Sequence, residues 1–351
     1  MNLFPILAVE SSCDETAVAI LGESGEVMAN EVSSQDEVHA AFGGVVPEIA
    51  AREHIIKIAA LAESALDKAK LNPEDVGTVA ATYGPGLIGP LMVGLQFAKG
   101  FAQAQGKRFI GIHHIEGHLM AAKIDAAFPK PPFLALIVSG GHSALYQYAG
   151  LGDITTLGET RDDAAGEAFD KIAKLLGLGY PGGRVIDERA KLGDPEKYKL
   201  PISLRQKDTL DYSFSGLKTA VRLLVTELEK SGIDDIVIND VCASAQKVIV
   251  QALLNKAFLA AQKTKATHLV LGGGVSANSL LRANALKRGE EEGISVYIPP
   301  KNLCTDNALM IALAARERLL QGQSSDLTIG PQPGASVNGA NTVIIDGTSF
   351  S

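Results

Sequence analysis

The hydrophobic pattern at the start of the chain predicts a β-hairpin. Two apolar runs, residues 7–9 and 16–21, flank the small and acidic segment 10–15, which suits a hairpin tip. Such a tip exposes backbone N–H groups that can hold phosphate oxygens, and its acids Asp14 and Glu15 can orient a cation, a water molecule or an amine. The alternative is an ordinary polar turn.

The same pattern returns after the interruption at Lys130-Pro131-Pro132. Apolar runs at residues 133–138 and 143–148 flank the glycine-rich turn Ser139-Gly140-Gly141-His142. A hairpin repeated at the head of each half predicts two related α/β lobes with a ligand cleft between them.

The remaining periodicity predicts further helices and strands. Helices are expected over 47–71, from near 90, over 216–228 and over 235–264, and strands over 27–32, 78–82, 109–112 and 268–271. The last strand runs into Gly272-Gly273-Gly274 before a helix, where bare backbone leaves room for a nucleotide. Asn278 is well placed there to donate to a phosphate or a ribose.

These elements divide the chain of 351 residues into two lobes and a tail. We expect lobe I to cover residues 1–129, with a helix over 306–320 packing back on it, and lobe II to cover 130–305. From about residue 321 the sequence turns to Gly, Ser, Asn and Pro, which predicts a mobile tail over 321–351. The 46% of hydrophobic residues suffice for sizeable cores.

The net charge and the length of the apolar runs argue against some classes of function. A formal net charge of −8 argues against general electrostatic binding of nucleic acid, unless a local basic patch or a partner supplies the cations. The most basic region is predicted to be a solvated surface, with RNA contact as the alternative. It contains Lys191, Lys197, Lys199, Arg205 and Lys207. With no apolar run judged long enough to span a bilayer and no signal-peptide pattern, we expect a cytoplasmic protein without membrane contact.

His114 and His118 are the strongest candidates for metal ligands. In a helix they lie four residues apart on one face, and Asp306, at a predicted helix start, is the best candidate for a third ligand. Two histidines and one carboxylate with open positions suit zinc or ferrous iron. The alternative is a histidine-rich helix whose side chains are satisfied within the protein.

The spacing differs from that of the zincin proteases, in which the catalytic Glu directly follows the first His. Here Glu116 stands two positions after His114 and, on a helix, points roughly 200° away from it. A metalloprotease is therefore disfavoured.

Over nearly its whole length the chain resembles the bacterial TsaD branch of the universal tRNA threonylcarbamoyladenosine transferase family. Eight motifs stand in the family's order: residues 10–16, 113–118, 138–142, 169–171, 180–183, 212–218, 272–278 and 304–307. The resemblance implies the fold of the actin, sugar-kinase and chaperone ATPase superfamily, a duplicated ribonuclease H-like fold with a central ligand cleft. That fold agrees with the repeated hairpin.

The resemblance also implies an acyltransferase reaction. It moves the threonylcarbamoyl group from threonylcarbamoyl-AMP to N6 of the adenosine next to the anticodon, in tRNAs that read codons beginning with A. The implied metal ligands are His114, His118 and Asp306, with Fe²⁺ favoured and Zn²⁺ as the alternative, and Asp14 or Glu15 could accept the proton of the amine. The implied adenylate-binding residues are Ile137, Val138, Ser139, Gly140, Gly141, Asp170, Gly183, Asp187 and Asn278.

Helper proteins are implied as well: a paralogous TsaB-like subunit that lacks the metal site, and a small TsaE-like ATPase. An acidic chain that must engage tRNA fits that dependence. Two other function classes stay open. An ATPase or kinase of the same superfamily would use the hairpin tips for ATP phosphates, and a non-catalytic scaffold would only recruit tRNA-modifying partners.

Overall fold

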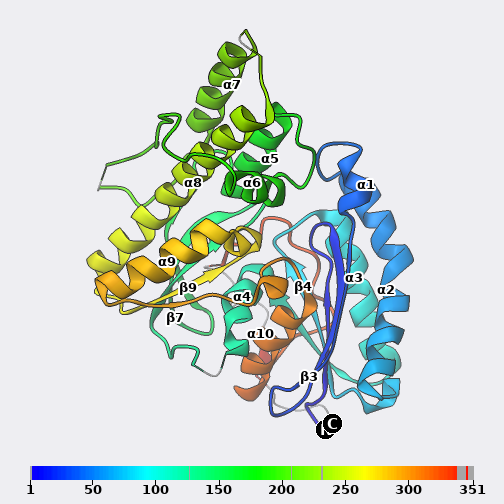
Figure 1. The fold of residues 1–351 in the computed structure, drawn as a ribbon. Helices are drawn as coiled ribbons and strands as arrows, with labels where there is room; N and C mark the ends of the chain where they lie inside the picture. Colours follow the sequence, from blue (N-terminus) through cyan, green and yellow to red (C-terminus); the bar gives the residue numbers. More distant parts are fainter. Residues whose placement is uncertain (1, 126, 207, 231, 338–344, 347–351) are drawn as a thin grey trace.

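The two predicted hairpins begin two β-sheets that share one topology (Figure 1). The computed structural model describes residues 2–125, 127–206, 208–230, 232–337 and 345–346. In the first sheet the order is β3-β2-β1-β4-β5, and in the second it is β8-β7-β6-β9-β10. In each, three antiparallel strands are followed by two strands parallel to the first. This correspondence matches the duplication expected from the sequence.

The eight predicted strands lie close to their predicted positions, whereas the strands over 153–159 and 295–297 were not predicted. The first sheet contains β1 (Ile6–Glu10), β2 (Glu15–Leu21), β3 (Val27–Ser34), β4 (Thr78–Gly84) and β5 (Arg108–His113). The second contains β6 (Phe133–Val138), β7 (Ser143–Gly150), β8 (Asp153–Glu159), β9 (His268–Gly272) and β10 (Ser295–Tyr297). All residues of β1, β4 and β6 are buried, which explains why their apolar runs are continuous rather than alternating.

Helices cover the outer faces of both sheets. On the first lie α2 (Pro47–Ala69) and α3 (Ile88–Ala104), after the short α1 (Asp36–Ala40). On the second lie α5 (Ala165–Leu175), α6 (Gly182–Ala190), α7 (Ser215–Glu229), α8 (Asp235–Thr264) and α9 (Ser279–Glu292). Short 3₁₀ helices cover Pro73–Asp75, Ala121–Ile124, Gly274–Ala277 and Lys301–Leu303.

Two helices lie between the sheets, α4 (His114–Met120) and α10 (Ala308–Leu320) (Figure 1). They share one buried core with β1, β2, β6 and β7. The helix expected to return to the first sheet is thus α10, which packs on β1 and β2. The boundaries proposed for the two lobes stay a prediction.

The segment expected to be a mobile tail begins after α10. Its residues 325–335 lie along the first sheet, where the N–H of Ser325 donates to the Phe109 carbonyl at 2.9 Å and that of Gln332 donates to the Tyr83 carbonyl at 2.7 Å. The edge strand β5 offers backbone groups that such a segment can satisfy. The pair β11 (Gln323–Ser324) and β12 (Ile345–Asp346) also forms here, and 338–344 and 347–351 lie outside the described residues.

One helix among the described residues, α8, is long and apolar enough to cross a membrane by length and composition, although the sequence reading expected no such run. Of its most apolar window, 61% is buried inside the protein. The helix packs against the second sheet and its covering helices, so its apolar residues supply the core.

Candidate active site

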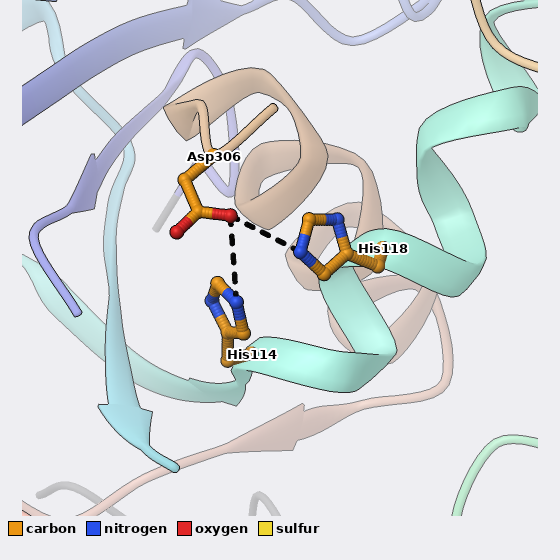
Figure 2. A group of neighbouring side chains, drawn as sticks. All are labelled: His114, His118 and Asp306. Carbon is orange, nitrogen blue, oxygen red and sulfur yellow. Dashed lines mark ion pairs between the residues drawn. The ribbon is translucent and has the colours of Figure 1, made fainter. Parts of the chain in front are cut away.

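The three predicted metal ligands come together between the sheets. β5 leads directly into α4, which carries His114 and His118 on one face, while Asp306 precedes the N-cap of α10. The Asp306 Oδ1 atom lies 3.1 Å from Nε2 of His118 and 3.5 Å from Nε2 of His114 (Figure 2). The potential ligand atoms all lie within 4.8 Å of one another.

The chemistry of this cluster fits a divalent metal. His118 is fully buried, and neither of its ring nitrogens makes a hydrogen bond of good geometry to the described residues, although Asp306 is near. A buried polar atom without a partner is costly, and a shared metal ion would engage the facing nitrogen lone pairs and the carboxylate. Two imidazoles and one carboxylate leave coordination positions open for a substrate.

The charges in the cluster also favour a cation. Burial by itself would raise the pKa of Asp306, but His114 and His118 outweigh it and hold that pKa well below its ordinary value. Burial would lower the pKa of His114, but Asp306 and Glu10 raise it to about 9. The two carboxylates thus favour a positive charge on the His114 ring, and a metal ion at Nε2 would have to displace the proton there.

Glu10 is a site residue that the sequence reading did not single out. Its Oε2 lies 3.3 Å from Nδ1 of His114, and it also accepts from the hydroxyl of Thr82 and from the N–H of Ser12. A carboxylate that only accepts places the imidazole proton on Nδ1 and leaves Nε2 free to bind a metal. In the sequence, the only signal for this role is that an acidic residue directly follows an apolar run that predicts a strand.

Glu116 points away from the ligands, as its position on the helix predicted. It forms a buried ion pair with Arg318 of α10, with 2.8 Å between Oε2 and Nε. This pair joins the helix that carries both histidines to the helix that follows Asp306. Glu116 is therefore part of the scaffold and not a base beside the metal.

The hairpin tip that carries Asp14 and Glu15 lies next to this cluster. The Ser12 hydroxyl is 3.1 Å from Nδ1 of His114. Burial, followed by Asp306 and Asp14, raises the pKa of Glu15 well above its ordinary value, so these acids share one electrostatic environment. The predicted ligand Asp306 thus acts electrostatically on Glu15, and the role of Asp14 or Glu15 as proton acceptor stays a prediction.

The glycine-rich loop after β4 supports the tip. The N–H of Leu87 donates to the Ser12 carbonyl at 2.8 Å, and a side chain at Gly86 would begin 2.5 Å from that oxygen. Close approach to the tip therefore explains Gly86.

The predicted adenylate-binding turn of the second hairpin presents bare backbone. The N–H of Ser139 donates to the His142 carbonyl at 2.7 Å, which closes the turn. At Gly140 and Gly141 a Cβ would meet no atom of the described residues within 4 Å. At Gly183 the nearest such atom, Cβ of Phe169, lies 3.9 Å away. These positions leave space that a ligand could fill.

The other predicted adenylate-binding residues already have partners within the protein. Asp170 accepts from the N–H of Gly182, while Asp187 accepts from both the N–H and the hydroxyl of Ser279. Asn278 caps α9 and donates to Gln246. Ile137 and Val138 lie buried in β6. Asp187 and Asn278 thus meet at the start of α9, and their contact with an adenylate stays a prediction.

Two of the three glycines at the end of β9 allow close backbone packing, and Gly272 does so against the helix that carries the histidines. A Cβ at Gly272 would lie 2.7 Å from the His118 carbonyl oxygen, and one at Gly273 would lie 2.4 Å from that of Val138. Gly273 also has a φ of +84°, which disfavours other residues. Close backbone packing therefore explains these two glycines. From the sequence we expect instead that they leave room for a nucleotide.

Comparisons with known proteins match most of the chain. The family described as "TsaD: tRNA N6-adenosine threonylcarbamoyltransferase" matches residues 26–313. A protein of that name from Anaeromyxobacter dehalogenans (strain 2CP-C) is 49% identical over 330 residues, which cover 93% of this chain and 98% of the relative.

Two solved structures share the fold. Full-length HypF, in a phosphate- and nucleotide-bound form, aligns with 90% of this chain and 55% of its own, with a TM-score of 0.58 and 15% identity. An activator of the 2-hydroxyisocaproyl-CoA dehydratase from Clostridium difficile, with bound ADPNP, aligns with 91% and 96%, with a TM-score of 0.52 and 14% identity. At such identities the likeness concerns the fold alone, and it confirms the predicted two-lobed, actin-like α/β fold.

Proposed function

This chain belongs to the TsaD family of tRNA N6-adenosine threonylcarbamoyltransferases, and we propose that its donor is threonylcarbamoyl-AMP and its acceptor the adenosine next to the anticodon. It is an acyltransferase that modifies tRNA. The proposed tRNAs read codons beginning with A. The new bond joins the carbamoyl carbon of the donor to N6 of the adenosine, and AMP leaves with the electron pair of the bond that breaks.

The observation that carries the proposal is the convergence of His114, His118 and Asp306. Their charges also act on His142 in the turn of the second hairpin, whose pKa is lowered to about 4 by burial and then by His114 and His118. These three residues would hold one divalent ion, with Fe²⁺ favoured and Zn²⁺ as the alternative. Such an ion supplies Lewis acidity, which can orient the threonyl group or polarise the carbonyl under attack.

The protein's own acids suit the proton that must leave the adenosine amine. The lone pair of this amine is delocalised into the ring, so attack is aided by a base within hydrogen-bond reach. The hairpin tip that contacts His114 through Ser12 also carries Asp14 and Glu15, and burial, followed by Asp306 and Asp14, raises the pKa of Glu15. We assign this role to Asp14 or Glu15.

The adenylate would lie against the second lobe. Bare backbone at Gly140, Gly141 and Gly183 admits a phosphate or a ribose at van der Waals distance. The remaining proposed contacts are Ile137, Val138, Ser139, Asp170, Asp187 and Asn278. Because the target base must reach the space between the lobes, we expect it to be splayed out of the anticodon loop.

Helper subunits complete the proposal. The net charge of −8 leaves tRNA phosphates poorly matched by this chain alone, which supports a basic partner. The neighbouring helices α2 and α3 expose the apolar side chains of Ile55, Ile56, Ile88 and Met92, a surface that suits a stable subunit contact. We propose a TsaB-like paralogue and a small TsaE-like ATPase as partners, and a cytoplasmic location.

The test is mass-spectrometric nucleoside analysis of unmodified tRNA, incubated with this protein, its helper proteins and threonylcarbamoyl-AMP. The His118→Ala and Asp306→Ala variants run beside the intact protein. We expect modified adenosine with the intact protein and almost none with either variant. Equal product from the variants would reject the metal-centred site, and nucleotide turnover without tRNA would favour the ATPase interpretation.

A further inference from the structure

The imidazole of His54, on α2, contacts two residues at the tip of the first hairpin. His54 on α2 is fully buried, and its Nε2 lies 3.0 Å from the carbonyl oxygen of Cys13. A carbonyl only accepts, so Nε2 carries the ring proton and Nδ1 is an acceptor. The Thr16 hydroxyl donates to that Nδ1 at 2.7 Å. The ring thus bridges the two residues that flank Asp14 and Glu15.

The bridged segment needs such support because its acids repel one another. Burial, followed by Asp306 and Asp14, raises the pKa of Glu15. Asp36 at the start of α1 adds a further acid, and burial followed by Asp14 raises its pKa. Burial lowers the pKa of His54, which keeps the ring neutral and in the tautomer that its two partners require.

The hydrogen bonds continue from His54 to α1. The Gln35 Nε2 atom lies 3.5 Å from Nδ1 of His54 and 3.4 Å from the Ala50 carbonyl oxygen. The Oε1 atom of Gln35 accepts from Nε2 of His39 at 3.1 Å, and Nδ1 of His39 accepts from the N–H of Val46 at 3.4 Å. Thr16 takes the single lone pair of His54 Nδ1 at 2.7 Å, so the contact of Gln35 at 3.5 Å is the weaker one, and from Gln35 to Val46 donors and acceptors alternate.

The path ends in the loop 41–46, which lies beside the second lobe. A Cβ at Gly43 would lie 3.5 Å from Nζ of Lys174, near the end of α5. The network therefore connects the acidic tip to a loop that faces the opposite lobe.

We propose that His54 is a positioning residue for the transfer reaction. By bridging the Cys13 carbonyl and the Thr16 hydroxyl, it fixes Asp14 and Glu15 relative to Asp306. Gln35 and His39 tie this position to the loop 41–46, which lies near Lys174 of α5. The inference rests on the proposed function, in which one of these acids takes the proton of the adenosine amine.

Three variants test the inference. His54→Leu keeps apolar volume but removes both hydrogen bonds, whereas His54→Gln can still donate to one partner and accept from the other. Ile58→Ala is the matched control, because Ile58 is a core residue one turn further along α2. Each variant is assayed for kcat and KM in the reconstituted transfer reaction and for backbone hydrogen exchange over residues 11–16.

We expect His54→Leu to lower kcat about 10- to 100-fold while KM for tRNA stays within about twofold. Exchange over residues 11–16 should accelerate in this variant, and His54→Gln should restore most of both. Ile58→Ala should lower the melting temperature and leave kcat and this exchange unchanged.

Unchanged exchange over residues 11–16 in His54→Leu would overturn the inference. So would a kcat close to that of the intact protein, or a loss in Ile58→Ala as large as in His54→Leu. If the intact protein makes no product at all, the proposed function fails, and the exchange data alone then decide whether His54 holds the tip.

Discussion

Glu10 and His114 form a buried carboxylate–imidazole pair, with 3.3 Å between Oε2 and Nδ1. Glu10 is completely buried, and its remaining acceptor capacity is met by Ser12 and Thr82. The pair turns Nε2 of His114 toward Asp306. We therefore expect Glu10, in the first strand, to affect how tightly the site binds a metal.

Replacing Glu10 by Gln should weaken metal binding about 10- to 100-fold, because the pair fixes both the tautomer and the orientation of His114. Chelator competition with Zn²⁺ and with Fe²⁺ measures this affinity directly. Glu26→Gln, at an exposed position after β2, is the control and should bind as the intact protein does. Equal affinities in the two variants would show that Glu10 does not act through His114.

Replacing Arg318 by Met should lower the free energy of unfolding by about 3–5 kcal/mol, since it leaves the buried carboxylate of Glu116 without its partner. Urea denaturation measures the loss. The double variant with Glu116→Gln should recover part of it, because the uncompensated charge is removed. A loss no larger than that of Arg184→Met, which breaks an exposed pair with Glu188, would contradict the expectation.

Two glycine variants distinguish a glycine that leaves space for a ligand from one that allows close backbone packing. Gly141→Ala should change the free energy of unfolding by less than about 0.5 kcal/mol, because its Cβ would enter open space, yet it should raise KM for threonylcarbamoyl-AMP. Gly273→Ala should cost about 1–3 kcal/mol, because its φ is positive and the Val138 carbonyl is near. An unchanged KM in Gly141→Ala would mean that the adenylate does not approach this turn.

His54 should make the protein less stable as the pH falls. Its folded pKa is lowered from 6.5 by burial, so below pH 6.5 the unfolded chain binds a proton there that the folded chain does not. Stability is therefore lost as the pH drops from 6.5 toward the folded pKa and levels off below it. Urea denaturation across this window should show a smaller loss for His54→Gln, and equal losses would contradict the assignment.

The sequence by itself determined the local features. The apolar runs predicted both hairpins and α8, because the length of a run and the turn residues that bound it are local features of the chain. The periodicity of a helix put His114 and His118 on one face and turned Glu116 away from them. Repetition of the hairpin indicated the duplicated fold, and the chemistry of Asp306 made it a candidate ligand.

Only the tertiary structure decided which residues meet. Periodicity assigns a side chain to a face but not to a partner across it, so the pairing of Glu10 with His114 could not be read from the chain. The composition of α8 suits a membrane or a core equally well, and its packing on the second sheet distinguishes them. The contacts of His54 with Cys13 and Thr16 require α2 to lie against the hairpin. Complementary packing fixes this long-range contact, and the local sequence does not.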